Sequence, residues 1–301
     1  MSVRKTITGL GFCGMDYLCL VPHIPLDDKV EILQSAVQGG GPSVNAIATA
    51  ARLGAATAFI GCVGNDQRGR DITAGLAAEG VNVSGMKIRE GAESAAGFCW
   101  IEKQSGKRSI AWTRGTAQPL SAEEIAPKLI KTSSLLHLDG HQTEAAIAAA
   151  KLARQHGVAV SIDAGTLVPG IEQLLELADI IIASEKFACR YTGQSDVETA
   201  AKKLFAVNCK FSAVTMGNKG SVGFDGGRLF KCPAFNVTTV DTTGAGDAFH
   251  GAFAHEYVRG GTWPECLRFA SAVAALKCTR FGGRAGIPDL KTTEEFLKQH
   301  E

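Results

Sequence analysis

The turn that decides the fold reads Asp241-Thr242-Thr243-Gly244-Ala245-Gly246-Asp247-Ala248-Phe249-His250-Gly251, between a β-like run at residues 235–240 and a helix-like run at residues 249–257. Its glycines allow backbone N–H groups to point the same way where the helix would begin. Unpaired amides and the helix dipole both favour an anion there. A carboxylate at Asp247 makes chemical sense in such a place if it takes a proton from a hydroxyl that attacks a phosphoryl group.

The rest of the chain alternates short apolar runs with helix-like segments. Strands are expected near residues 6–13, 57–63, 135–138, 159–162, 180–183 and 212–215, and helices near residues 43–53, 70–79, 144–156, 171–177, 185–191, 197–207, 245–259 and 264–279. This pattern is typical of a mainly parallel sheet covered by helices on both faces. Two β-rich insertions, at about residues 17–38 and 92–117, interrupt it. We therefore expect one α/β domain over residues 1–301.

Composition narrows the possible partners and compartment. The chain has 301 residues and a formal net charge of +1, and its charges are interleaved, which gives no support for a nucleic-acid or membrane partner. The nine cysteines are odd in number and form no C-x-x-C pair, so free thiols in a reducing compartment are expected. No apolar stretch approaches the length of a membrane span. These features predict a cytoplasmic protein.

Three motifs occur in the order and spacing of one known family. The turn at residues 241–251 resembles the C-terminal signature of the PfkB, or ribokinase-like, carbohydrate kinases, and Gly39-Gly40-Gly41-Pro42-Ser43-Val44-Asn45 and Gly61-Cys62-Val63-Gly64-Asn65-Asp66-Gln67-Arg68-Gly69 resemble two further family motifs. The resemblance covers essentially the whole chain. It implies a three-layer α/β sandwich in which the two insertions form a small β lid, used in the family over the sugar site and often as a dimer interface. It also implies a homodimer, a small sugar substrate, and ATP with Mg²⁺.

The resemblance assigns roles residue by residue. It implies that Asp247 is the general base and that the amides of Gly244, Ala245 and Gly246 stabilise charge on the transferring γ-phosphoryl group. The sugar would contact Asp16, Gly40, Gly41, Asn45 and Arg108. The nucleotide would contact Ser184, Thr215, Gly217, Gly220, Gly244 and Gly246, since residues 215–220 resemble the T-x-G-x-x-G motif of the family.

Some positions depart from the usual family pattern. Where many members have N-x-x-E, tied to magnesium and phosphate, this chain has Ser184-Glu185-Lys186-Phe187, which leaves the Mg²⁺ contacts open. The resemblance implies a monovalent-cation (K⁺) site at Asp241 and Thr243, but the expected serine is Gly286, which argues against potassium activation. The stretch at residues 184–187 resembles ketohexokinase-like members more closely than ribokinases, and the closing stretch, residues 274–289, resembles that of sulfofructose kinases.

Other functions stay open at this point. A nucleoside kinase on the same fold would need an aromatic side chain in the lid to stack on the base, for which Trp100 and Trp112 are candidates. A sugar-phosphate kinase would need cationic groups, for which Lys29, Arg108 and Arg114 are candidates. A non-catalytic sugar sensor is the remotest alternative, because such a protein would be expected to have lost Asp247.

Overall fold

The computed structural model describes residues 5–300, and a nine-stranded sheet forms the centre of this part of the chain. Its strands are β1 (Thr6–Leu10), β4 (Ala56–Gly64), β5 (Asn82–Arg89), β8 (Leu135–Leu138), β9 (Ala159–Ala164), β10 (Ile180–Ser184), β11 (Phe211–Thr215), β12 (Ser221–Phe224) and β13 (Leu229–Cys232). They lie in the order β13-β12-β11-β10-β9-β8-β1-β4-β5. All pairs from β11 to β5 are parallel, and β12 and β13 add an antiparallel edge.

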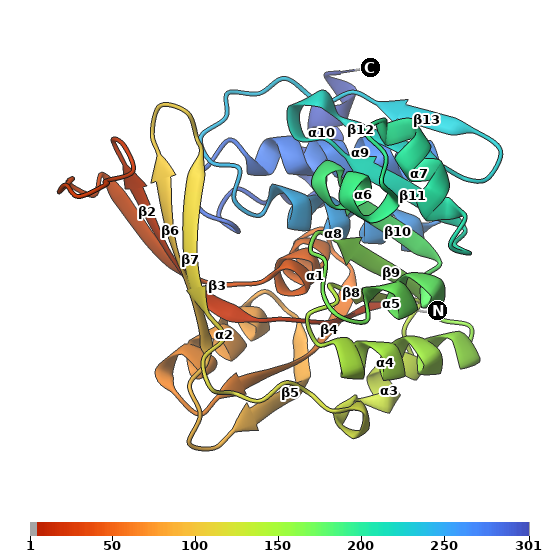
Figure 1. Ribbon diagram of the computed structural model, residues 1–301, viewed down its shortest axis with the longest axis horizontal. Coiled ribbons are helices and arrows are strands. Elements are labelled where there is room, and N and C mark those ends of the chain that lie inside the picture. Colours follow the sequence, from red (N-terminus) through yellow and green to blue (C-terminus); the bar gives the residue numbers. More distant parts are fainter. Residues whose placement is uncertain (1–4, 301) are drawn as a thin grey trace.

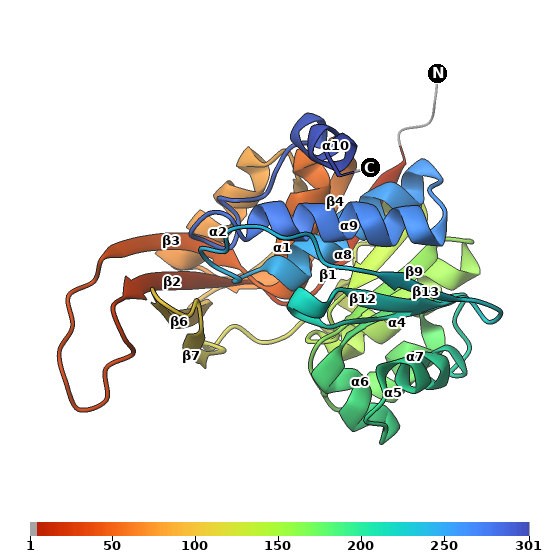
Figure 2. The same ribbon diagram turned by 90° about the horizontal axis from the view of Figure 1, so that it is seen from above.

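Helices cover both faces of this sheet (Figure 2). One face carries α1 (Pro42–Arg52), α2 (Gln67–Ala78), α8 (Ala245–Arg259), α9 (Trp263–Lys277) and α10 (Leu290–Lys298). The other carries α3 (Pro127–Lys131), α4 (Thr143–Gln155), α5 (Ile171–Leu177), α6 (Glu185–Thr192) and α7 (Val197–Phe205). Each helical layer packs on its own hydrophobic core. The predicted α/β architecture, with a mainly parallel sheet between two helical layers, is therefore confirmed.

Local sequence explains why these elements form. Strand β10 is buried on both faces, so its apolar residues run continuously through Ile180, Ile181 and Ile182 rather than alternating. Helix α4 places alanines at helical spacing on its buried side, at positions 145, 146, 149, 150 and 153. Helix α1 begins at Pro42, where the missing N–H of proline leaves no hydrogen bond unmade.

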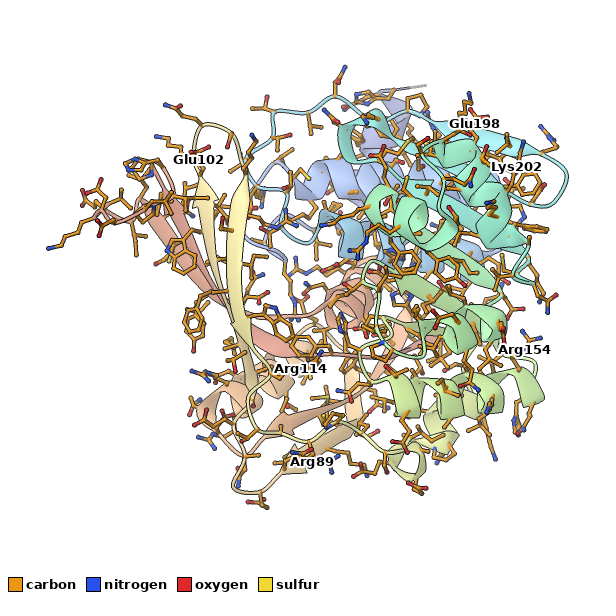
Figure 3. All side chains as sticks on the ribbon, viewed as in Figure 1. Arg89, Glu102, Arg114, Arg154, Glu198 and Lys202 are labelled. Atoms are coloured by element: carbon orange, nitrogen blue, oxygen red, sulfur yellow. The ribbon has the colours of Figure 1, made fainter. Side chains whose placement is uncertain are left out.

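A second, four-stranded sheet projects to one side of the molecule (Figure 1). It contains β2 (Gly14–Val21), β3 (Gln34–Gly40), β6 (Ala95–Glu102) and β7 (Arg108–Thr113), in the order β3-β2-β6-β7. Figure 3 shows Glu102 at the outer end of the β6–β7 hairpin and Arg114 at its opposite end. Both β-rich insertions thus contribute strands to one sheet. Strands β2 and β3 extend beyond the expected range, to Gly14 and Gly40.

The strand expected at residues 235–240 is wrong: this segment is an irregular connection from β13 to α8. Phe235 packs edge-on against Phe296, and the N–H groups of Val240 and Asp241 donate to the carbonyl oxygen of Cys278. The segment therefore satisfies its backbone at the end of α9 and adds no strand to the sheet. Strand β5 and helix α10 were not expected from the sequence. None of the described helices is long and apolar enough to cross a membrane.

Candidate active site

Asp247 lies in the first turn of α8, directly after the glycine turn. Gly244 caps this helix with a positive φ of 74°, a conformation that favours glycine. The Asp247 carboxylate is only partly exposed, and its Oδ2 accepts a hydrogen bond of 2.8 Å from Nδ2 of Asn45 on α1. Burial raises the pKa of Asp247 to about 7, and the Asp163 carboxylate adds to this effect. The site thus holds a carboxylate that exchanges its proton near neutral pH.

The amides of the glycine turn differ in how they are used. The N–H of Ala245 already donates to the carbonyl oxygen of Thr242 at 3.2 Å, as part of the turn. Within residues 5–300, the N–H groups of Gly244 and Gly246 donate to no protein acceptor. A Cβ added at Gly246 would meet no atom within 4 Å, so the space beside this residue is open. Of the three predicted amides, those of Gly244 and Gly246 are free for an anion.

Asp16 and the glycines of residues 39–41 form one wall. Asp16 lies on β2 opposite Gln38 of β3, and a Cβ on Gly40 would come within 1.8 Å of its Oδ2. Gly41 has a φ of 122°, and a Cβ there would lie 2.3 Å from the carbonyl oxygen of Phe12. Only glycine allows these approaches. Burial raises the pKa of Asp16 to about 6, and the positive charge of Arg284 opposes this shift.

Arg108 reaches the same turn from the four-stranded sheet. Its Nη1 donates to Oγ1 of Thr242 at 3.0 Å, although the two residues are far apart in sequence. Trp112, four positions further along β7, pairs across the sheet with Gly97, which itself pairs with Asp16. Directly paired residues share a face, so Arg108 and Trp112 project on the face that carries Asp16. Trp100 lies an odd number of residues from Gly97 on β6 and therefore projects on the opposite face.

The residues predicted to bind nucleotide lie together at the carboxyl ends of two strands. Ser184 ends β10 and pairs in register with Thr215, which ends β11. The Ser184 hydroxyl accepts from the N–H of Phe187 at 3.2 Å and caps α6. Gly217 and Gly220 follow with positive φ angles of 59° and 90°. In a parallel sheet, ligands gather at this edge.

The region of Asp241 and Thr243 does not fit a monovalent cation well. Asp241 Oδ1 accepts from the N–H of Thr243 at 2.8 Å, and its Oδ2 accepts from the N–H of Gly282 at 2.9 Å. The ammonium group of Lys277, which is fully buried, donates to the Asp241 carbonyl oxygen at 2.8 Å. A Cβ on Gly286 would lie 2.2 Å from the carbonyl oxygen of Lys277, so no serine hydroxyl can be placed there without rearrangement. The ammonium group of Lys277 therefore already occupies the position beside Asp241.

Sequence reasoning missed two buried groups beside the site. Arg284, in the loop after α9, donates from Nε to Oδ1 of Asn45 at 2.9 Å. His250, one turn after Asp247, places Nε2 3.3 Å from Oδ1 of Asp163 at the end of β9. The available signals were a charged residue within a glycine-rich loop and a histidine inside an apolar helix.

Cavities of the described chain lie mainly outside this constellation. One of about 720 Å³ is formed between β13, the segment after it and α9, and contains none of the predicted site residues. A smaller one of about 200 Å³ opens beside Phe12, Arg114 and Gln142. Asp247 and the glycine turn line neither of these two cavities.

Comparison with known proteins agrees with this fold. The model of the pfkB family of carbohydrate kinases matches residues 10–290. Fructokinase-1 from Oryza sativa subsp. japonica is 31% identical, over 99% of this chain and 98% of the relative. The structure of a putative ribokinase from Agrobacterium tumefaciens is 30% identical, covers 98% of each chain and superposes with a TM-score of 0.90. Arabidopsis thaliana ribokinase, solved with ribose and ATP, is 26% identical with a TM-score of 0.85 and covers 98% of this chain and 99% of its own. The chain belongs to the pfkB family of carbohydrate kinases.

Proposed function

We propose that this protein transfers the γ-phosphoryl group of ATP to a sugar hydroxyl, with Asp247 as the general base. The observation that carries the proposal is a carboxylate with a pKa near 7 in the first turn of a helix, beside the free amides of Gly244 and Gly246. A base works best when its pKa lies near the operating pH. Asp247 would accept the proton of the attacking hydroxyl, and Asn45 would keep its carboxylate oriented.

The glycine turn would stabilise the phosphoryl group during transfer. The amides of Gly244 and Gly246 lie at the positive end of the α8 dipole, and Ala245 would contribute only by sharing its N–H. The nucleotide would extend toward Ser184, Thr215, Gly217 and Gly220. Mg²⁺ would neutralise phosphate charge; it is usually bound through substrate phosphates and water rather than by a dedicated protein cage.

The acceptor would bind between the two sheets. Asp16 supplies a carboxylate for sugar hydroxyls, and the backbone at Gly40 and Gly41 allows close approach. Arg108 closes the other side through its contact with Thr242. Relatives named ribokinase and fructokinase support a pentose or ketohexose as acceptor.

A nucleoside kinase is the second candidate, because Trp112 provides an aromatic surface on the site face. Its exposed fraction is 56%, and its ring lies edge-on to Phe12 with 6.2 Å between ring centroids. The guanidinium of Arg114 lies over the Trp112 ring, 5.1 Å from the ring centroid, and would favour a phosphorylated sugar instead. A non-catalytic sensor would not need a carboxylate with a pKa near 7 at position 247, so the pKa of Asp247 argues against that function.

A homodimer through the four-stranded sheet is supported by apolar residues on its outer face. Val37 and Phe98, which flank Tyr17 in register, have exposed fractions of 61% and 40%. Apolar side chains gathered on a sheet face are typical of a protein interface.

The decisive experiment measures ADP release from Mg-ATP with ribose, fructose, fructose 6-phosphate and adenosine as acceptors. One strong acceptor would establish the class, and Asp247→Asn should then lower kcat by about 10²- to 10⁴-fold while ATP still binds. Retention of near-full turnover in Asp247→Asn would exclude the proposed base. ATP binding without any phosphorylated acceptor would favour the sensor.

A further inference from the structure

Arg284 is a buried guanidinium at the centre of the site, with an exposed fraction of only 6%. It lies in the loop after α9, far in sequence from both Asn45 and Asp247. Its backbone is held by β3 and α1: its N–H donates to Oε1 of Gln38 at 3.4 Å, and its carbonyl oxygen accepts from Arg52. The charged groups around it are Glu79, Arg52, Asp16 and Asp247. Burying a charged group costs free energy unless it is paired and hydrogen-bonded, so we ask which of its donors have partners.

One part of the guanidinium sets the orientation of Asn45. Arg284 Nε donates to Asn45 Oδ1 at 2.9 Å, and Asn45 Nδ2 donates to Asp247 Oδ2 at 2.8 Å. An arginine can only donate, so it requires the oxygen of the amide on its own side. The NH₂ group must then face Asp247. Without Arg284 the amide could turn over and present its oxygen to the carboxylate, which would repel it.

Another part of the guanidinium has no protein partner. Nη2 of Arg284 is buried and donates to no acceptor within residues 5–300. It lies against Gly39, 3.3 Å from the position that a Cβ would take there, next to the glycines proposed to frame the sugar. A buried donor without a partner is costly, and an oxygen of a ligand would satisfy it.

We infer that Arg284 is a positioning residue for Asp247, acting through Asn45, and that its Nη2 binds an oxygen of the acceptor. This inference rests on the proposed function. Asp16 accepts hydrogen bonds whereas Arg284 donates them, and the two side chains interact electrostatically. Together they fit an acceptor with neighbouring hydroxyls, one donating to Asp16 and the other accepting from Arg284. Sugars have this arrangement.

A double-mutant cycle tests both parts. The variants Arg284→Gln, Asn45→Ala and their combination are assayed with ribose and with fructose at saturating Mg-ATP. Arg284→Gln should lower kcat about 10- to 100-fold and raise the KM of the acceptor, because bonds to a charged donor are lost. In the Asn45→Ala background, the kcat loss should shrink to about twofold or less while the rise in KM remains. Full additivity in kcat would overturn the positioning role, and an unchanged KM would overturn the contact with the acceptor.

Two controls separate these effects from general damage. Arg154→Gln makes the same substitution at an exposed arginine of α4, distant from the four-stranded sheet in Figure 3. It removes only a hydrogen bond to the carbonyl oxygen of Leu177 and should leave kcat and KM unchanged. If Arg284→Gln does not fold, Arg284→Lys is assayed in its place, because it keeps the positive charge. A single ammonium cannot reproduce both donors in this geometry, so at least one of the two losses should persist; wild-type values for both would overturn the inference.

A measurement without substrate separates this inference from the proposed function. In apo protein labelled with ¹⁵N-asparagine, the Asn45 side-chain NH₂ can be assigned by its loss in Asn45→Ala. Its hydrogen exchange should be about tenfold or more faster in Arg284→Gln than in the wild type, since the amide is no longer held. Equal exchange rates would overturn the positioning role even if sugars are phosphorylated. Failure of the wild type to phosphorylate any sugar, with faster exchange in the variant, would instead reject the proposed function.

Discussion

Nε2 of His250 and Oδ1 of Asp163 lie 3.3 Å apart, where α8 crosses the end of β9. The imidazole is buried, and its ring lies tilted beside that of His137, with 5.5 Å between ring centroids; burial is the main cause that lowers the pKa of His137 to about 3. Although burial raises the pKa of Asp163, the histidine charge and hydrogen bond hold it below its usual range. Asp163 is therefore a carboxylate kept negative in the interior, close enough to Asp247 to raise the pKa of the proposed base.

The charge of Asp163 should set the lower limit of the active pH range. Asp247 must be deprotonated to act, so kcat/KM should fall as the pH drops through about 7. Asp163→Asn removes a negative neighbour and should move this limb to lower pH. The measurement is kcat/KM as a function of pH for the wild type, Asp163→Asn and His250→Asn. Since His250 lowers the pKa of Asp247, replacing His250 should move the acidic limb of the profile to higher pH. An acidic limb at the same pH in all three proteins would contradict this account.

Asp247 should also make folding depend on pH. Its pKa is about 7 in the folded protein and 3.8 without the protein environment, so the folded state binds the proton more tightly. The resulting stabilisation is complete below about pH 3.8 and is lost as the pH rises through about 7. Asp247→Asn, which stays neutral, should therefore be more stable than the wild type above pH 7, by roughly 1–3 kcal/mol. Denaturant unfolding at pH 5 and pH 8 measures this, and a gain that is larger at the lower pH would refute it.

Replacing each of the two glycines of the turn by alanine should affect a different property, stability in one case and turnover in the other. Gly244→Ala forces a side chain into a φ of 74° and places a Cβ 2.8 Å from the carbonyl oxygen of Gly283, so it should destabilise the fold by about 1–2 kcal/mol. Gly246→Ala meets open space and should leave the melting temperature unchanged or higher. Its methyl group would occupy the open space beside the glycine turn, where we propose that the phosphoryl group passes, so kcat should fall. Full turnover in Gly246→Ala would mean that the phosphoryl group does not pass there.

Lys277 should make the enzyme independent of potassium. Its ammonium group donates to the carbonyl oxygen of Asp241, where the family resemblance implies a cation. Wild-type turnover should be equal in potassium and choline salts of the same ionic strength. Lys277→Ala opens space beside Asp241 and should show lower turnover that potassium partly restores. Activation of the wild type by potassium, with no change in its response after Lys277→Ala, would contradict the assignment.

Much of the fold could be predicted from the sequence because buried parallel strands and amphipathic helices leave strong periodic patterns. Strand β5 was missed because Asn82–Arg89 mixes polar and apolar residues at the edge of the sheet. Residues 235–240 were misassigned for a different reason. Phe235 packs on Phe296 of α10 and beneath Arg268 of α9, and a β-like sequence cannot distinguish such packing from pairing in a sheet.

The candidate site was partly predictable for a related reason. Asp247, Gly244 and Gly246 belong to one contiguous motif, so sequence alone brings them together. Arg284 meets Asn45 only after the chain has folded, and its charge within a glycine-rich loop does not by itself indicate that it is buried or which residue it contacts. The monovalent-cation site was placed from the motif, whereas the position of the Lys277 ammonium group depends on how α9 ends.

Helix α8, which carries Asp247, packs between α1 and α9 and against the central sheet. The proposed base, carried on so enclosed a helix, cannot adjust its position to the shape of the acceptor. The fit to each acceptor must then come from the opposite wall, which is built from β2, β3, β6 and β7 and borders solvent. Substitutions in those strands can therefore change which acceptor is preferred, while Asp247 and the glycine turn stay the same.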